Sequence, residues 1–435
     1  MNREILRIAL PSIVSNITVP LLGLVDVAIV GHLGATGYIG AIAVGGMLFN
    51  VIYWLFAFLR MGTSGLTSQA FGAHSISEQI LSLLRACVVA LIIAAILILC
   101  QVPLRQLSFL IVSPTAEVAT LTQTYFHICI WGAPAMLLLY GLTGWFIGMQ
   151  NAKIPLWIAI VQNLTNILCS LLFVYGLNMK IEGVATGTLI AQYAGLLTAL
   201  VLGRKYYLPL FAGRTMPLLN QIWDKEAMLR FFSINRDIFL RTLCLVAVTM
   251  YFTAAGAAQS NIILAVNTLL MQLFTLYSYI MDGFAFAGEA MCGRFYGARD
   301  KRSFMLTVKH LWLWGLIMAA LFTLVYVLGG KHFLALLTDQ ASVIDASGEY
   351  FFWAILIPAA GLLTFIWDGI YIGLTASRVM LVSMASGATV FFALYLSTGP
   401  MWGNHALWLA FLCYLLTRGI VESIIFRRYT RGLCS

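Results

Sequence analysis

Long apolar runs, broken by short polar connections, recur along the whole chain. A helix needs about 20 apolar residues to cross the hydrocarbon core of a bilayer, and many of these runs reach that length. Their lengths, measured against the intervening Gly, Pro and charged residues, predict twelve spans and hence an all-α polytopic membrane protein. The expected spans are 8–31, 40–70, 80–102, 123–150, 155–176, 183–203, 231–254, 262–293, 307–329, 350–376, 379–398 and 403–426.

The longest polar connection divides these spans into two groups of six. It runs from Gly203 to Arg230, between the sixth and seventh spans, with the sequence GRKYYLPLFAGRTMPLLNQIWDKEAMLR. A link between two helical bundles would lie at this point. We therefore expect two pseudo-symmetric six-helix bundles, with the N-terminal bundle at 1–203, a cytoplasmic linker at 204–230 and the C-terminal bundle at 231–435.

Short motifs of the first half return in the second half in the same order. Two pairs share one offset, and a third pair differs from that offset by only three residues. Ordered repeats indicate duplication, and two equivalent bundles provide the geometry that alternating access needs. The pairs are FGA at 71–73 with YGA at 296–298, FIGM at 146–149 with YIGL at 371–374, and LGA at 33–35 followed by AV at 43–44 with AGA at 255–257 followed by AV at 265–266.

The composition excludes an ordinary soluble domain, because 61% of the residues are hydrophobic and only 9% are charged. The net charge of +9 does not indicate nucleic acid, because most of the Lys and Arg residues fall on one set of loops and tails. The opposite set holds only Arg105, Lys180 and Lys331. This bias predicts a multi-pass protein with both termini in the cytoplasm.

The cysteines and histidines do not indicate an enzyme or a metal site. The eight cysteines are scattered without CxxC pairs, and the six histidines are isolated. The chain has no HExxH or GxSxG motif and no Gly-rich phosphate loop with a supporting strand. We therefore expect neither catalysis nor a bound cofactor.

Asp26 is the acidic residue of the first span, in the apolar stretch LLGLVDVAIVG at 21–31. A charge within a bilayer costs at least about 2.5 kcal/mol, so such a carboxylate usually faces a protein cavity and has a function. The alternative is an interfacial residue that caps the end of the span. Pro11 and Pro20 lie earlier in the same span and are expected to act as hinges, so protonation of Asp26 would be coupled to bending.

Five motifs resemble the multidrug and toxic compound extrusion (MATE) family, specifically the branch typified by DNA-damage-inducible protein F (DinF). They cover nearly the full length and keep the family order. The motifs are LPSIVSN at 10–16, DVAIVGHLG at 26–34, NRDIF at 235–239, DGFAFAGEA at 282–290 and WDGIYIG at 367–373.

The resemblance implies an antiporter of the bacterial cytoplasmic (inner) membrane. Such a protein uses protons or sodium ions to drive the efflux of organic compounds, often cationic and amphipathic xenobiotics. Its partners would be a small organic substrate and membrane lipid, not nucleic acid, and we expect a monomer. The alternatives are a flippase for lipid-linked oligosaccharides or a metabolite exporter on the same scaffold. The embedded charges are mostly acidic, which favours cationic cargo.

The fifth span departs from the family pattern. Many relatives carry an Asn followed four residues later by an Asp, which form a polar pocket with the aspartate of the first span. Here Asn166 is followed by Ser170. A serine forms hydrogen bonds but holds no negative charge at neutral pH. The resemblance therefore implies an ion-coupling site of Asp26, Asn166 and Ser170 in which Asp26 carries the charge.

Acidic residues of the second half are candidates for a cavity in the C-terminal bundle. Asp282 and Glu289 are seven residues apart and fall on nearly the same helix face. Glu289 could instead pair with Arg294. Asp368 occupies the repeat position of Thr143, and this asymmetry favours ion binding or attraction of a substrate over a requirement of the fold.

Two further charged pairs have the i,i+4 spacing of local ion pairs within one helix. Asp237 and Arg241 lie near the start of the seventh span, and Arg418 and Glu422 lie in the twelfth. We expect both pairs to neutralise themselves locally, without a role in transport.

Overall fold

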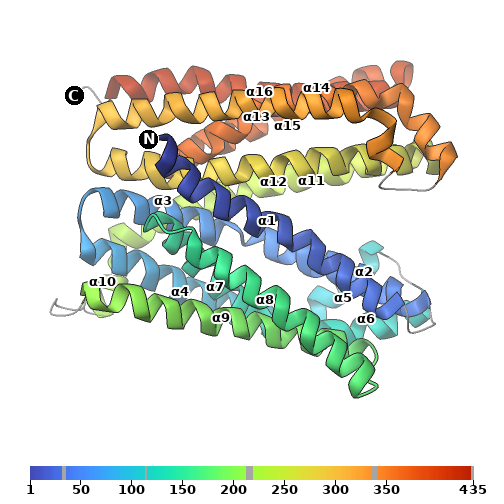
Figure 1. Cartoon of the computed structure of the whole chain (residues 1–435), viewed down its shortest axis with the longest axis horizontal. Coiled ribbons are helices and arrows are strands. Elements are labelled where there is room, and N and C mark those ends of the chain that lie inside the picture. Colours follow the sequence, from blue (N-terminus) through green and yellow to red (C-terminus); the bar gives the residue numbers. More distant parts are fainter. Residues whose placement is uncertain (32–35, 113–114, 212–218, 336–339, 433–435) are drawn as a thin grey trace. The chain divides into compact units, whose positions relative to one another are not determined.

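The computed structural model describes residues 1–31, 36–112, 115–211, 219–335 and 340–432, and these residues form helices and their connections (Figure 1). Eleven described helical segments are long and apolar enough to cross a membrane. The 30-residue helix α1 precedes them and provides the twelfth. The predicted fold class, an all-α membrane protein with twelve transmembrane helices in two bundles, is thereby confirmed.

The chain divides into two compact units, Val14–Phe231 and Met1–Ile13 with Phe232–Ser435, called here the N-terminal and the C-terminal unit. The first thirteen residues thus group with the C-terminal unit, and the described residues of the predicted linker, 204–230, group with the N-terminal unit. The domain ranges 1–203, 204–230 and 231–435 stay a prediction. Helix α1 (Asn2–Gly31) consequently contributes to both units, and the boundary falls two residues after Pro11.

The N-terminal unit contains the later part of α1 and the helices up to the middle connection. Two of its membrane-spanning segments are interrupted near their middle. One interruption is the turn between α2 and α3, and the other is the 3-10 turn η1 that leads into α7. Its elements are α2 (Thr36–Leu55), α3 (Phe58–Gly72), α4 (Ile76–Leu99), α5 (Gln101–Val112), α6 (Ala116–Cys129), η1 (Ile130–Gly132), α7 (Ala133–Gly148), α8 (Lys153–Leu171), η2 (Leu172–Gly176), α9 (Ile181–Phe211) and α10 (Leu219–Ile222).

The C-terminal unit contains six long helices and the start of α1. Helix α12 packs closely on α14, and α15 packs on α16. Several helices begin earlier than predicted, because their polar first turns extend beyond the apolar stretch; the tenth span starts at Ala341 instead of 350. The helices are α11 (Lys225–Gln259), α12 (Asn261–Gly297), α13 (Lys301–Ala335), α14 (Ala341–Gly373), α15 (Ser377–Trp402) and α16 (Asn404–Gly432).

The first thirteen residues are fixed to the C-terminal unit by side-chain contacts. The Trp314 indole N–H donates to Asn2 Oδ1 at 3.3 Å. Gly283 of α12 faces the backbone of α1, and a Cβ added at Gly283 would lie 2.9 Å from the Ala9 carbonyl oxygen. Only a residue without a side chain permits this close approach of the two helices.

The middle connection is largely helical and is held by the N-terminal unit. Helix α9 continues to Phe211, residues 212–218 are not described, and α10 follows. Arg85 of α4 is buried and donates to the carbonyl oxygens of Gln221 at 2.9 Å and Ile222 at 3.2 Å. These carbonyl groups end α10 and lack helical partners, so Arg85 caps the helix.

The internal repeat is visible in the backbone. Helices α3, α7, α12 and α14 each end two residues before a residue other than glycine that has a positive φ angle. These residues are His74 (54°) with Arg299 (56°), and Gln150 (64°) with Thr375 (54°), and the same 225 residues separate both pairs. The turns after α3 and α12 also lead into the next helix in the same way. The side chain of Ser75 caps the start of α4, and the side chain of Asp300 caps the start of α13.

Two pairs of glycines repeat with the turns. Gly144 and Gly148 of α7 face the backbone of α3, and Gly369 and Gly373 of α14 face the backbone of α12. A Cβ at Gly148 would lie 2.8 Å from the Ser64 carbonyl oxygen. The motif LGA at 33–35 lies outside the described residues. For the remaining motifs, the equivalent turns and contacts support the duplication that the sequence predicted.

A Gly373→Ala variant should be less stable than the wild type, by about 1–3 kcal/mol. The added Cβ would lie 2.8 Å from both Glu289 O and Gly293 N, which are backbone atoms that cannot rotate away. Thermal unfolding of the purified protein in detergent measures the effect. Gly46→Ala is the matched control, because a Cβ at Gly46 meets nothing within 4 Å. Equal melting temperatures for the two variants would contradict the close packing of α12 on α14.

Candidate functional site

The N-terminal unit contains a buried polar cluster around Asp26. Asp26 of α1 is 7% exposed, and Asn166 and Ser170 of α8 are fully buried. Asn166 and Ser170 are one helical turn apart and therefore share a face of α8. Asn166 interacts with the Asp26 side chain. Asp26 and Asn166, two of the three predicted ion-coupling residues, thus meet, and Ser170 lies one turn further along the same helix.

Helices α9 and α6 complete this cluster. The Asn166 amide donates to Thr188 Oγ1 at 3.0 Å. Gly187, the preceding residue of α9, faces Ser170, and a Cβ at Gly187 would lie 2.6 Å from Ser170 Oγ. Tyr125 and Cys129 of α6 interact electrostatically with Asp26.

Asp26 has no basic partner in the described part of the chain. No ion pair to its carboxylate is formed there, and its buried Oδ1 atom accepts no hydrogen bond. A buried carboxylate without a counter-ion is costly, so it takes up a proton or a cation. No group of three or more metal-ligating side chains occurs among the described residues. Asp26, Asn166 and Ser170 provide one acidic and two neutral polar side chains.

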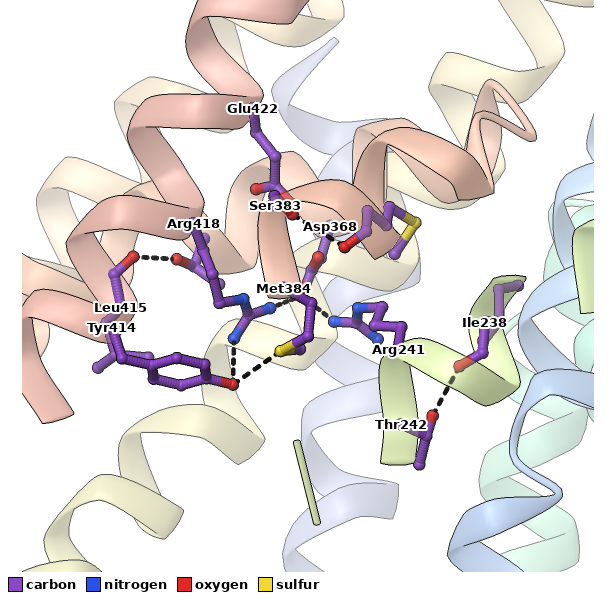
Figure 2. Close-up of polar contacts among 12 residues, drawn as sticks. Ile238, Arg241, Thr242, Asp368, Ser383, Met384, Tyr414, Leu415, Arg418 and Glu422 are labelled. Atoms are coloured by element: carbon purple, nitrogen blue, oxygen red, sulfur yellow. Dashed lines mark hydrogen bonds and ion pairs between the residues drawn. The ribbon is translucent and has the colours of Figure 1, made fainter. Parts of the chain in front are cut away.

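The C-terminal unit contains a second cluster, in which Asp368 lies between two arginines (Figure 2). Asp368 Oδ2 accepts from Arg241 Nη2 of α11 and from Arg418 Nη2 of α16, the latter at 2.8 Å. All three residues are buried. Asp368 is therefore not an uncompensated carboxylate, and these three groups together carry one net positive charge.

Aromatic and sulfur groups fix the orientation of Arg418. Its Nη1 atom donates to the Tyr414 hydroxyl group at 3.3 Å, and that hydroxyl group lies 2.9 Å from Met384 Sδ (Figure 2). The guanidinium group also lies over the Tyr414 ring, 5.3 Å from its centroid. Contacts of this kind stabilise a buried cation.

Both predicted local ion pairs are wrong. Asp237 pairs with Arg236 at 3.0 Å and accepts from Ser377, while Arg241 reaches Asp368. In α16, Arg418 also reaches Asp368, so Glu422 is left to accept from Ser383 Oγ at 2.7 Å. The i,i+4 rule describes exposed helix surfaces. Here a carboxylate of a neighbouring helix is the better partner, because α11, α14 and α16 share the buried site.

The other predicted acids of the second half both lie on α12. Asp282 is partly buried, and Glu289 is 1% exposed. Their role in a cavity stays a prediction. Sequence reasoning missed Arg241, Arg418 and Tyr414 as partners of the site. The available signal was that charged residues within apolar spans need partners on other helices.

The structure describes only part of the predicted hinge. Pro11 is partly buried, and α1 remains helical through it. The side chain of Pro20 lies outside the described residues. Near Pro11, Ser12 Oγ donates to the Ile8 carbonyl group at 2.9 Å, and Thr18 Oγ1 donates to the Ser15 carbonyl group at 2.7 Å. Such back-bonding often accompanies helix bending.

The fold and the two clusters define a polytopic membrane protein with a buried cluster of ionisable and polar groups in each of two duplicated units. A family model described as MatE matches residues 11–172 and 238–395, which is most of the chain. The protein belongs to the MatE family of membrane transporters. The family resemblance found in the motifs is thereby confirmed.

Several known proteins match over nearly the full length. DNA damage-inducible protein F of Escherichia coli (strain K12) is 38% identical, and the match covers 99% of this chain and 93% of that protein. A probable multidrug resistance protein NorM of Idiomarina loihiensis is 23% identical and covers 97% and 93%. The Vibrio cholerae MATE transporter VcmN in its bent form has a TM-score of 0.86 at 17% identity, covering 99% and 97%.

Replacing Asp368 with Asn should destabilise the protein by about 3–5 kcal/mol, because two buried arginines lose the carboxylate that both contact in the described part of the chain. Thermal unfolding in detergent measures the effect. The matched control is Glu349→Gln, which removes an exposed pair with His405 and should change stability by less than about 1 kcal/mol. If Asp368→Asn were as stable as the control, the two arginines would not depend on this carboxylate.

Proposed function

We propose that the protein is a cation-coupled antiporter that exports organic, cationic and amphipathic compounds by alternating access, with protons or sodium ions as the counter-ion. The observation that carries this proposal is Asp26, a buried carboxylate whose Oδ1 atom has no partner and which forms no ion pair in the described residues. Names of relatives support it, since they include a probable multidrug resistance protein and a multidrug and toxin extrusion protein.

Coupling requires that the driving ion and the substrate favour different conformations. We propose that a proton or a cation at Asp26 favours a bent or repacked α1 from which substrate is released. Helix α1 suits this role because it carries Asp26 in the N-terminal unit and begins in the C-terminal unit. Pro11 lacks an N–H group and removes one helical hydrogen bond close to the boundary, which lowers the cost of bending there.

Asn166 and Ser170 have supporting roles in this proposal. Asn166 is held by Thr188 and presents its amide to Asp26, so it orients the carboxylate. The Oγ atom of Ser170 and the Oδ1 atom of Asn166 are buried without hydrogen-bond partners. These two oxygen atoms are available to a bound ion or to a water molecule, while the charge change rests on Asp26.

The Asp26 carboxylate also supports the proposal that the substrate is cationic. A cationic compound is attracted by an uncompensated negative charge, and Asp26 provides one. Asp368, the other candidate, is already neutralised by Arg241 and Arg418. A flippase for anionic lipid-linked oligosaccharides would need unpaired cations in its cavity, whereas these two arginines are engaged. Cationic cargo therefore remains the better proposal, and it depends on the N-terminal unit.

The cellular setting completes the proposal. We place the protein in the bacterial cytoplasmic membrane as a monomer, with both termini in the cytoplasm. Support comes from the Lys and Arg bias of the loops and from the bacterial relative that covers nearly the whole chain.

Asp26→Asn should abolish gradient-driven export without unfolding the protein, because the amide keeps the shape of the carboxyl group but loses its charge. The measurement is efflux of a fluorescent organic cation from proteoliposomes, with a proton gradient in one set and a sodium gradient in another. Loss of at least about tenfold in the coupled rate is expected, equivalent to about 1.4 kcal/mol. The gradient that drives the wild type identifies the coupling ion.

The control for this experiment is Asp345→Asn, which changes a carboxylate near the start of α14, far along the chain from the predicted site. It should transport like the wild type. Normal coupled export by Asp26→Asn would refute the mechanism. Absence of export of any organic cation by folded wild-type protein would favour a lipid-linked or metabolite substrate instead.

Pro11→Ala should slow gradient-driven export several-fold and leave substrate affinity unchanged, because alanine restores the missing helical hydrogen bond and stiffens α1. Equilibrium binding and efflux rates of the same fluorescent cation separate the two effects. The matched control is Pro400→Ala, which makes the same change near the end of α15. Similar slowing by both variants would mean that the position of Pro11 has no special importance.

A further inference from the structure

Glu422 of α16 is a buried carboxyl group that the proposed mechanism does not use. It is 0% exposed, and its Oε1 atom accepts from Ser383 Oγ at 2.7 Å. Its Oε2 atom is buried and has no hydrogen-bond partner. The Tyr371 hydroxyl group donates to the backbone carbonyl oxygen of Glu422 at 2.6 Å, so this hydrogen bond does not involve the carboxyl group. One of the two carboxyl oxygens is therefore unsatisfied.

No arginine compensates Glu422 directly. Arg241 and Arg418 both direct a terminal nitrogen to Asp368 Oδ2, and neither forms an ion pair with Glu422 (Figure 2). An ionised carboxylate with a single neutral donor in a dry interior is unfavourable, since a buried charge needs both a partner and full hydrogen bonding. A protonated carboxyl group has no such requirement. The geometry thus fits a Glu422 side chain that carries a proton.

The surroundings of Glu422 favour a proton over a metal ion. Among the described residues, three charged groups act on it: Asp368 from α14, Arg241 from α11 and Arg418 from its own helix. Helix α15 contributes the hydroxyl group of Ser383, and α13 meets α16 through the stacked rings of Phe304 and Phe426. Two guanidinium groups next to the carboxyl group repel a metal cation, whereas a proton binds covalently to one oxygen and needs no further ligands.

We propose that Glu422 is a second proton-binding residue of the transport cycle, located in the C-terminal unit. The proposal deepens the proposed antiport function and rests on it. A proton occupies Oε2 while Arg418 pairs with Asp368. When Glu422 releases the proton, the cluster of Glu422, Asp368, Arg241 and Arg418 changes from one net positive charge to neutral.

Arg418 is the residue that responds to this change. It lies one helical turn before Glu422, within reach of an i,i+4 pair, and its Nε atom is buried without a partner. Deprotonated Glu422 competes with Asp368 for this guanidinium group. An exchange of partners would leave Asp368 with Arg241 alone. Proton binding at Glu422 would therefore control the contact between α14 and α16 at Asp368.

Infrared difference spectroscopy of the purified protein tests the proposal directly. Spectra recorded between about pH 5 and about pH 9, where buried carboxyl groups titrate, reveal the C=O band of a protonated carboxyl group. The Asp26→Asn variant is the starting protein, so that Asp26 does not contribute. We expect a band that disappears at high pH and that is absent from the Asp26→Asn/Glu422→Gln double variant.

Two further variants make the assignment specific. Ser383→Ala removes the hydrogen bond to Oε1 and should move the band to higher frequency without abolishing it. Glu349→Gln changes an exposed glutamate of the same unit and should leave the band unchanged. Because Ser383→Ala keeps the carboxyl group, it tests the assignment even if Glu422→Gln fails to fold.

Three results would overturn the proposal. One is a band that persists in the double variant, another is the absence of any titrating band, and the third is loss of the band when sodium replaces potassium at constant pH. Failure of the antiport proposal is detected by a different assay, the proteoliposome experiment, in which the wild type would show no gradient-driven efflux. The infrared result for Glu422 does not depend on that assay.

Discussion

The burial of charge within apolar helices is the constraint on which the rest of this structure depends. Every ionised group in the membrane region needs a partner, a bound ion or a proton, because lipid provides none of them. In the C-terminal unit, Asp368 meets this requirement internally, because arginines from two other helices hold it. The N-terminal unit leaves Asp26 without a basic partner in the described residues. A proton or cation from outside can therefore bind at Asp26. Asp368 is less open to such binding, because its carboxylate is already paired with two arginines.

The duplication explains why the two units have the same backbone arrangement at equivalent helices but different side chains at their buried sites. Glycines 144 and 369, and 148 and 373, bring equivalent helices into backbone contact, and equivalent turns follow them. Between these fixed points the side chains are free to differ. Thr143 bonds to its own helix, whereas the equivalent Asp368 binds two other helices. Equivalent backbone positions thus carry the neutral Thr143 in one half and the ion-paired Asp368 in the other.

The sequence was sufficient to predict the helical class, the spans and the duplication, because apolar length and ordered repeats are local signals. It also identified Asp26, Asn166 and Asp368 as polar groups of interest. The partners of Asp368 could not be predicted in this way. Arg241 lies 127 residues and Arg418 lies 50 residues from Asp368 in sequence, and each has an acid at i±4 that the spacing rule for helices favours as its partner. Only the packing of α11, α14 and α16 decides between near and distant acids.

Helix α1 has a consequence for how the two halves recognise each other. Its first thirteen residues belong to the C-terminal unit, although the chain that follows them belongs to the other unit. If the gene were divided at the middle connection, the N-terminal fragment would carry the segment that packs against Gly283 and Trp314 of its counterpart. The fragments would possess a built-in docking sequence. The duplicated halves are thus not interchangeable modules, because each is incomplete without the chain of the other.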